Sequence, residues 1–320
     1  MKAIVVREFG VPDVMKLEEV SIPQVSEKQV LVKIEAVGIN PVDTYRRSGL
    51  YPVKPLLPYT PGSDAAGTII ELGEGVKKFS VGQRVYVSDN LSGAYAEFAL
   101  CSENQVHKLP DSVSFEEGAG VNVPYSTAYR ALFQKAHVKP SETVLIHGAS
   151  GGVGIAAVQF ARGNGLNIIG TAGTNEGLQL IKEQGVQHAL NHHEDNYLDE
   201  VLKITNGQGV DVILEMLANV NLNKDLTVIK KGGRLVIIGN RGKIEFDPRL
   251  AMSKDATLKG MTLLNVENSD WIVIHAAIGA CLEKGLIRPV IGERFKLEDA
   301  PKAHESIITS NAYGKIVLIP

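Results

Sequence analysis

The sequence predicts an α/β protein in which a doubly wound parallel sheet is joined to a second, mainly β domain. Three observations predict it. The chain has 320 residues, about twice the usual length of one domain. Short β-branched runs broken by Gly and Pro fill residues 1–120, as in an antiparallel barrel or sandwich. From about residue 122, apolar strands alternate with helical stretches, which is typical of a parallel sheet.

The composition excludes several classes of protein. Hydrophobic residues make up 44% and charged residues 22% of the chain, so it can bury a core and is not disordered. The net charge of −3 gives no support to a general polyanion-binding role. Two cysteines, Cys101 and Cys281, are too few for a disulfide framework or a four-thiolate zinc site. The chain shows no secretory signal and no apolar run long enough to span a membrane, so we expect a cytoplasmic protein.

The first domain is predicted to contain five short strands and one helix. The helix has Asn40 as its N-cap and Pro41 as its first residue, and it ends at Gly49. Cys101 follows the last strand and is expected to fill core space rather than act as a nucleophile. The strands are residues 3–7, 29–37, 65–72, 84–87 and 95–100.

The second domain is predicted to contain six buried strands, the number found in the dinucleotide-binding fold. They are residues 143–147, 166–171, 187–190, 210–215, 234–239 and 258–263. A helix over 269–284, a strand over 290–295 and a helix over 298–309 follow. The last strand, 315–319, is expected to pair back into the first domain. The predicted domains are therefore 1–121, completed by 265–320, and 122–264.

A glycine-rich loop carries the strongest chemical signal. Residues 143–157 contain a strand, a turn with the sequence His-Gly-Ala-Ser-Gly-Gly-Val-Gly, and the start of a helix. Gly151 would let the backbone approach a pyrophosphate, and Gly154 would allow close packing of helix and sheet. The helix N-terminus offers free N–H groups to phosphates. The loop departs from the strict pattern because Ala149 replaces the first glycine.

The end of the second strand predicts the choice of cofactor. NAD sites usually place Asp or Glu there for the ribose hydroxyls, whereas this chain has Ala172 among small residues. That position leaves room for a 2′-phosphate, and His192 and His193 are the nearest cationic candidates. A solvated loop histidine is the alternative for His192. Glu176 opposes phosphate binding unless it faces solvent, and we expect NADPH to be preferred on this pattern.

Five segments together resemble the zeta-crystallin-type NADPH:quinone oxidoreductases of the medium-chain dehydrogenase/reductase superfamily. They are residues 40–49, 55–64, 124–132, 147–154 and 215–222, and the resemblance covers nearly the whole chain. It implies a GroES-like catalytic domain (1–121 with 265–320) and a Rossmann NADPH-binding domain (122–264).

The resemblance also implies a set of cofactor contacts. The ends of the later strands, 215–221, 238–241 and 261–264, are expected to line the same crevice, although each could be ordinary loop. Tyr45 and Gly173 are implied by the family alone. The implied contacts are Tyr45, Ser150, Gly151, Gly152, Val153, Gly173, His192, Asn221, Ile238, Gly239, Asn240, Arg241, Met261, Thr262 and Leu263.

Zinc ligands of related alcohol dehydrogenases are missing. The first-ligand segment, 37–40, has no cysteine, the Gly-His-Glu segment is Gly-Ser-Asp at 62–64, and the four-cysteine loop is absent. We therefore expect no metal. Without a Lewis acid, hydride delivery to an electron-poor acceptor such as a quinone is the chemistry that remains.

Three catalytic candidates follow from this lineage. Tyr51 could polarise the acceptor carbonyl, or it could be a half-buried loop tyrosine. Asn40 could orient the substrate or the nicotinamide, or serve as the helix N-cap alone. Asp64 could be catalytic or a structural acid of a turn.

Three functions remain open on the sequence. NADPH-dependent reduction of a quinone leads, and reduction of an enone or 2-alkenal double bond in the same pocket is the alternative enzyme. A nucleotide-bound structural or RNA-binding protein is the alternative of another class, for which the charge offers no support. A homo-oligomer, dimer or tetramer, is expected because the sixth strand should form an apolar sheet edge.

Overall fold

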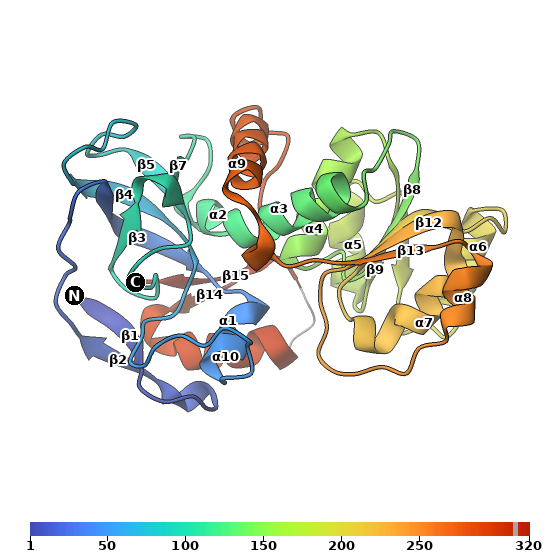
Figure 1. Cartoon of the computed structure of the whole chain (residues 1–320), viewed down its shortest axis with the longest axis horizontal. Helices are drawn as coiled ribbons and strands as arrows, with labels where there is room; N and C mark the ends of the chain where they lie inside the picture. Colours follow the sequence, from blue (N-terminus) through green and yellow to red (C-terminus); the bar gives the residue numbers. More distant parts are fainter. Residues whose placement is uncertain (310–312) are drawn as a thin grey trace. The chain divides into compact units, whose positions relative to one another are not determined.

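The computed structural model describes residues 1–309 and 313–320, which form two compact units. The first unit contains residues 1–123, 279–309 and 314–320, and the second contains Pro124–Ile278. The boundary falls within helix α9 (Asn268–Glu283), so residues 265–278, expected in the first domain, belong to the second unit. Figure 1 colours the chain along its length. No helix in the described residues has the length and apolar character needed to cross a membrane.

A mixed sheet of seven strands forms the frame of the first unit. Its order is β14-β15-β3-β4-β5-β7, with β6 also paired to β3, and β1 and β2 form a separate hairpin. The final strand pairs antiparallel to β3, which confirms the prediction that it pairs back into the first domain. The strands are β1 (Lys2–Val6), β2 (Met15–Glu19), β3 (Gln29–Gly38), β4 (Asp64–Leu72), β5 (Arg84–Ser88), β6 (Phe98–Ser102), β7 (Val106–Lys108), β14 (Ile291–Lys296) and β15 (Lys315–Ile319).

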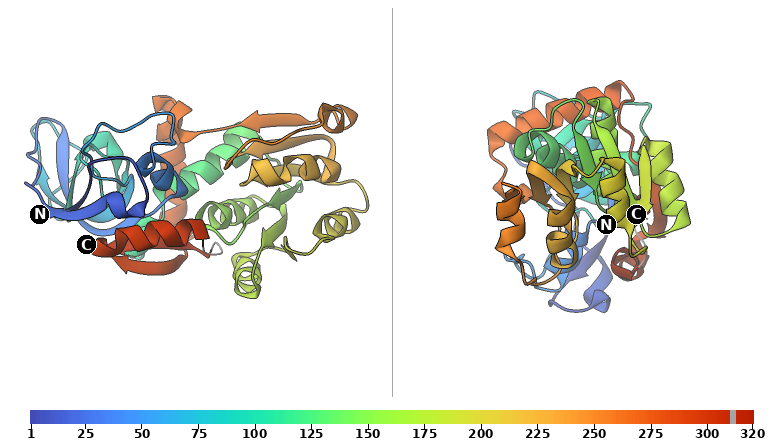
Figure 2. Two further views of the ribbon diagram at one scale, coloured as in Figure 1. Left: turned by 90° about the horizontal axis from the view of Figure 1, so that it is seen from below. Right: turned by 90° about the vertical axis from the view of Figure 1, so that its right-hand side faces the viewer.

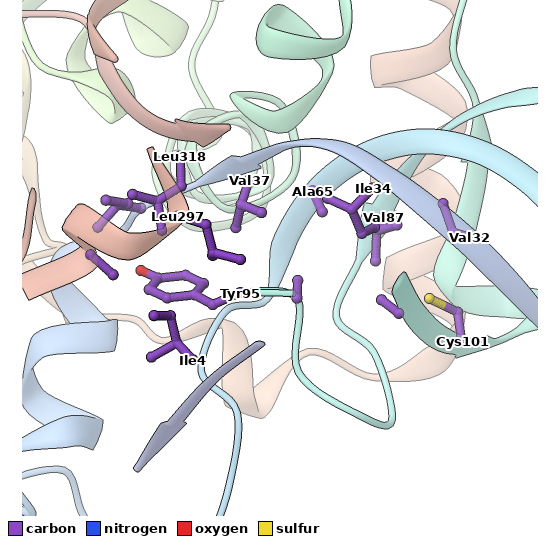
Figure 3. Close-up of a cluster of buried hydrophobic side chains, with 14 of the residues drawn as sticks. Ile4, Val32, Ile34, Val37, Ala65, Val87, Tyr95, Cys101, Leu297 and Leu318 are labelled. Atoms are coloured by element: carbon purple, nitrogen blue, oxygen red, sulfur yellow. The ribbon is translucent and has the colours of Figure 1, made fainter. Parts of the chain in front are cut away.

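Strands that are distant in sequence share one core in this unit (Figure 3). Ile4 of β1, Val37 of β3 and Leu318 of β15 are all buried there around Tyr95. Cys101 is fully buried in the same cluster, and burial raises the pKa of its thiol. The expectation that Cys101 fills core space is thus confirmed. The helices of the unit are α1 (Pro41–Arg47), α2 (Phe115–Ala119) and α10 (Ala300–Thr309).

The second unit is built on a six-stranded parallel sheet in the order β10-β9-β8-β11-β12-β13. Counted along the chain, this is the 3-2-1-4-5-6 order of the dinucleotide-binding fold, so the predicted fold class is confirmed. Helices flank the sheet, which Figure 2 shows from two further directions. The strands are β8 (Thr143–Ile146), β9 (Asn167–Ala172), β10 (His188–Asn191), β11 (Val210–Glu215), β12 (Ile229–Ile237) and β13 (Thr257–Gly260).

Two strands of this sheet, β12 and β13, differ from the sequence prediction by more than two residues at one end. β12 begins at Ile229, five residues before the expected start at 234, because its pairing with β11 shifts register after Ile229 and resumes at Arg234. The residues between are Lys230, Lys231 and two glycines. They are not part of an apolar run, so a prediction from apolar runs misses the start of the strand. β13 ends at Gly260 rather than 263, and a short 3₁₀ turn begins at Leu263.

Helix α3 (Asn122–Tyr129) begins in the first unit and continues into the second. The helices that follow in the second unit are α4 (Gly152–Gly163), α5 (Asn175–Gln184), α6 (Tyr197–Ile204), α7 (Ala218–Val228) and α8 (Pro248–Ser253). A π-helical turn over Arg130–Lys135 continues α3.

The edge strand β13 predicts self-association. It pairs with β12 and stands at the end of the sheet, with Leu264 half exposed beyond it. An open strand edge next to apolar side chains favours pairing with a second copy. We expect light scattering at working concentration to give at least about twice the chain mass of 34.5 kDa. A mass that stays at one chain over a tenfold concentration range would contradict this.

Candidate functional site

The glycine loop between β8 and α4 has the geometry of a phosphate cradle. Gly151 is the N-cap of α4, and no side chain caps the helix, so its first N–H groups face the loop. A Cβ at Gly154 would lie 2.3 Å from the carbonyl oxygen of Gly148, so only glycine permits this close approach. Gly148 has φ +56°, which glycine adopts without strain. Free N–H groups and the helix dipole suit a bound phosphate.

The parallel strands bring the predicted cofactor contacts to one edge of the sheet. Because β8 to β13 run in the same direction, their carboxyl ends meet there. A Cβ at Gly239 would lie 2.2 Å from the carbonyl oxygen of Met216, so the loops after β11 and β12 touch. Tyr45 lies in α1 of the other unit. The residues at the edge are Ser150–Val153 after β8, Gly173 after β9, His192 after β10, Asn221 in α7, residues 238–241 after β12 and residues 261–263 after β13.

Two imidazoles lie over the end of β9. A Cβ on Gly173 would be 2.9 Å from Nε2 of both His192 and His193, whose ring centroids are 4.5 Å apart. Burial, and then the charge of His193, lower the pKa of His192. Ala172 is buried beside them, and Glu176 is exposed, as the sequence prediction assumed. This corner offers small residues and imidazole donors, which suits a phosphate group.

A buried cluster that the sequence analysis missed lies behind the strand ends. His147 follows β8, Glu215 ends β11, and Asp225 lies in α7. His147 Nε2 is 2.8 Å from Asp225 Oδ1 and 3.6 Å from Glu215 Oε2. Burial raises the pKa of Glu215 to about 8. The pKa of His147 is also raised: burial lowers it, but the charges of Asp225 and Glu215 outweigh burial.

A second buried network joins four distant segments of the first unit. Lys315 Nζ is 3.1 Å from Asp64 Oδ2 and donates to Asn40 Oδ1 at 2.5 Å. Asn40 Nδ2 donates to Asp64 Oδ2 at 3.0 Å, and Asn122 Nδ2 donates to Asp64 Oδ1 at 2.9 Å. These side chains are all at least 95% buried. Asn40 and Asp64, two of the predicted catalytic residues, are therefore held in one structural network together with a lysine.

The first turn of α1 depends on the same segment. Asn40 is the N-cap, followed by Pro41, as predicted. The backbone N–H of Asn40 donates to Asp43 Oδ2 at 2.8 Å. Burial raises the pKa of Asp43 to about 6. The network thus fixes the start of the helix that carries Tyr45.

Tyr51, the third catalytic candidate, lies in a loop after α1 and is half buried. Its backbone N–H donates to the carbonyl of Tyr45 at 3.2 Å, and its ring centroid is 5.5 Å from the guanidinium carbon of Arg46. Arg46 also donates to Ser63 Oγ at 3.1 Å. A cavity of about 200 Å³ is lined by Arg46 with Asp43, Lys54, Tyr59, Ser63 and Asp89. The tyrosine therefore stands next to a cationic donor, Arg46, which the sequence analysis did not single out.

Family models match both units of the chain. Residues 26–111 match the alcohol dehydrogenase GroES-like domain, and residues 152–278 match the model described as zinc-binding dehydrogenase. The human quinone oxidoreductase is 48% identical over 321 residues, covering 100% of this chain and 98% of that protein.

Solved structures share the fold over the full length. The crystal structure of the Escherichia coli quinone oxidoreductase complexed with NADPH has a TM-score of 0.91 at 29% identity, with 100% of both chains covered. A structure named as an NAD-dependent alcohol dehydrogenase has a TM-score of 0.93 at 25% identity, again with 100% of both chains covered. Of these two structures, one is named for NAD and the other for NADPH. The local residues of this chain must therefore distinguish between the two cofactors.

Proposed function

Because the chain belongs to the quinone oxidoreductase family of the medium-chain dehydrogenases and reductases, we propose that it is an NADPH-dependent quinone reductase that works without zinc. The preference for NADPH over NADH is proposed from the residues at the end of β9. Ala172 replaces the usual acid there, and two histidines lie over Gly173. The name of the Escherichia coli structure with NADPH supports the same choice.

The residues of the second unit fit the cofactor. The N–H groups at the start of α4 would hold the pyrophosphate, and the glycines of the loop leave room for it. His192 and His193 would bind the 2′-phosphate. Bound NADPH supplies a hydride to the acceptor. The remaining contacts after β11, β12 and β13 would orient the nicotinamide end.

The chain's own donors would stabilise charge on the acceptor. Hydride arrival at a quinone carbon places negative charge on a carbonyl oxygen, and a donor aimed at that oxygen lowers the barrier. We assign this donor to the hydroxyl of Tyr51. Asn40 and Asp64, bonded to each other and to Lys315, hold the segment before α1 and act as positioning residues.

The Tyr51 assignment predicts a loss of turnover. Tyr51→Phe keeps the ring and removes the donor, so kcat with a quinone should fall about tenfold, with little change in NADPH affinity. Steady-state kinetics and a fluorescence titration of NADPH measure the two quantities. Tyr313→Phe, at a partly exposed tyrosine, is the matched control. Wild-type kcat in Tyr51→Phe with every acceptor would refute the assignment.

The buried lysine supports the absence of zinc. Lys315 Nζ lies between Asn40 and Asp64, in the two segments where related alcohol dehydrogenases carry ligands. An ammonium group there repels a divalent cation. Within the described residues, His147, Glu215 and Asp225 of the other unit are the one His, Cys, Asp or Glu group close enough to share an ion.

A metal analysis tests this part of the proposal. We expect purified protein to contain no stoichiometric zinc, and chelator treatment to leave NADPH oxidation unchanged. Incubation with ZnCl₂ followed by desalting serves as the control for metal recovery. About one zinc per chain, lost together with activity, would contradict the proposal.

The proposed activity is tested by NADPH oxidation with a panel of acceptors. A quinone should support turnover, and an enone or 2-alkenal of similar size should support at least tenfold less, about 1.4 kcal/mol in barrier. Faster turnover of the enone would favour the double-bond reductase. No oxidation with any acceptor, in protein that binds NADPH, would favour a nucleotide-bound structural or RNA-binding role.

A further inference from the structure

We propose that Glu215 carries a proton at neutral pH and holds the amide of Asn221 with its oxygen turned toward the nucleotide site. The proposal rests on the proposed function in one respect, because Asn221 is taken there as a cofactor contact. Glu215, Asp225 and His147 would then be positioning residues for the reaction. They form one buried cluster behind the ends of β8 and β11.

Charge balance in the cluster requires the extra proton. Glu215 and Asp225 side chains are fully buried, and the His147 side chain is 4% exposed. One imidazolium would neutralise only one of the two carboxylates, and an uncompensated buried charge is strongly unfavourable. Glu215 Oε2 and Asp225 Oδ2 both lack a hydrogen-bond partner among the described residues. A proton on Glu215 Oε2 gives the cluster zero net charge and gives Glu215 a donor to share with Asp225.

The raised pKa of Glu215, about 8, agrees with this arrangement, and burial is its main cause. His147 Nε2 lies 2.8 Å from Asp225 Oδ1, and the charges of Asp225 and Glu215 raise the pKa of His147 against the effect of burial, which favours the imidazolium. In the proposed state near pH 7, Glu215 is protonated and neutral, and His147 forms an ion pair with Asp225. Above pH 8 the cluster gains a negative charge.

The other oxygen of Glu215 determines the orientation of Asn221. Glu215 Oε1 accepts the backbone N–H of Leu217 and, at 3.3 Å, Nδ2 of Asn221. An acceptor oxygen selects the nitrogen of an amide, so Nδ2 faces inward and Oδ1 faces away from Glu215. Asn221 is partly exposed at the edge where the strands end. It would thus offer an acceptor to a donor on the nucleotide, such as a ribose hydroxyl or a carboxamide N–H.

The groups that face the cluster from each neighbouring element are few. His147 comes from the end of β8 and Asp225 from α7. Tyr197 of α6 lies edge-on to the His147 ring at 6.3 Å, and burial raises the pKa of Tyr197. Thr171 Oγ1 of β9 is 3.5 Å from His147 Nδ1. Burial, and then the charges of His193 and His147, lower the pKa of His192, which follows β10. We assign the expected change of charge near pH 8 to Glu215, whose pKa burial raises to about 8.

The first test is NADPH binding between pH 7 and pH 9.5, measured by fluorescence titration. Wild-type Kd should rise about tenfold over this range, the change given by a one-unit difference in the pKa of Glu215 between free and bound protein. Glu215→Gln mimics the protonated acid, so its Kd should match wild type at pH 7 and be about tenfold lower than that of wild type at pH 9.5, where any rise that the variant keeps is assigned to His192. Glu215→Ala should bind weakly at every pH. Glu183→Gln, at an exposed glutamate of α5, is the matched control.

The second test needs neither cofactor nor substrate, and so separates this proposal from the proposed function. Folded Glu215 keeps its proton up to about pH 8, whereas unfolded Glu loses it near pH 4.3. The folded state therefore binds more protons between these values, and stability falls as pH rises. The thermal midpoint of wild type should fall from pH 5 to pH 8.5 relative to that of Glu215→Gln.

Several results would overturn the proposal. Equal pH dependence of the thermal midpoint in wild type and Glu215→Gln would show that Glu215 is ionised throughout. A parallel rise of Kd in the two proteins would remove the link to Asn221. If Glu215→Gln does not fold, carbon NMR of wild-type protein labelled in its Glu carboxyl groups replaces the comparison. The absence of any Glu carboxyl that titrates above pH 7 would contradict the proposed proton on Glu215. Stoichiometric metal bound to these three residues would also contradict it.

Discussion

Ala172→Asp should erase or invert a preference for NADPH that is at least tenfold in kcat/KM in the unmodified protein, about 1.4 kcal/mol. A carboxylate at the end of β9 would accept the ribose hydroxyls of NADH and repel a 2′-phosphate. The site is tight, because Ala172 is 1% exposed and a Cβ on Gly177 would lie 3.1 Å from its methyl group. Ala172→Asn is therefore the necessary control, since it adds the same volume without charge.

His192→Ala should weaken NADPH binding and leave NADH nearly unchanged. The pKa of His192 is lowered in the free protein, so a phosphate that binds the imidazolium must bring a proton with it. NADPH affinity should therefore fall as pH rises through the bound-state pKa, while NADH affinity stays flat over the same range. Kinetics with both cofactors at pH 6 and pH 8 measure the effect. Equal kcat/KM for the two cofactors in the unmodified protein would refute the argument.

The strand rhythm after residue 122 was enough to predict the dinucleotide-binding sheet. Buried parallel strands are nearly continuous apolar runs, and β11 (Val210–Glu215) was predicted with its observed bounds. The pattern failed where packing rather than composition forms the strand. β2 has mostly exposed residues and β7 has three residues, so neither contains an apolar run. Lys230, Lys231 and two glycines hid the start of β12.

The nucleotide edge was predictable for a topological reason, and the buried networks were not. Residues after parallel strands must share one edge, so His192 and the segments after β11, β12 and β13 could be placed without coordinates, whereas Gly173 was implied by the family alone. By contrast, His147 meets Asp225 across 78 residues, and Lys315 meets Asp64 across 251. No local pattern carries such a pairing. The available signal was chemical: a lysine starting the apolar strand β15, and an acid ending the apolar strand β11.

Lys315→Met should lower the free energy of unfolding by about 3–5 kcal/mol, the usual loss when one partner of a buried ion pair is removed. The variant leaves the Asp64 carboxylate buried with only amide and N–H donors, from Asn40, Asn122 and Val123. Adding Asp64→Asn removes the stranded charge, so the double variant should recover part of the loss. Urea unfolding followed by fluorescence measures all three proteins.

The control for this prediction is an exposed ion pair in the same unit. Lys302 lies 2.7 Å from Asp299, with a side chain that is 72% exposed, and Lys302→Met should cost less than about 1 kcal/mol. If Lys315→Met were as stable as Lys302→Met, the buried pair would contribute nothing to the fold. The case for Asn40 and Asp64 as positioning residues would then fail, and with it the argument that Lys315 replaces a metal. A large loss that Asp64→Asn partly reverses supports both, because only a carboxylate left without its cation gives that pattern.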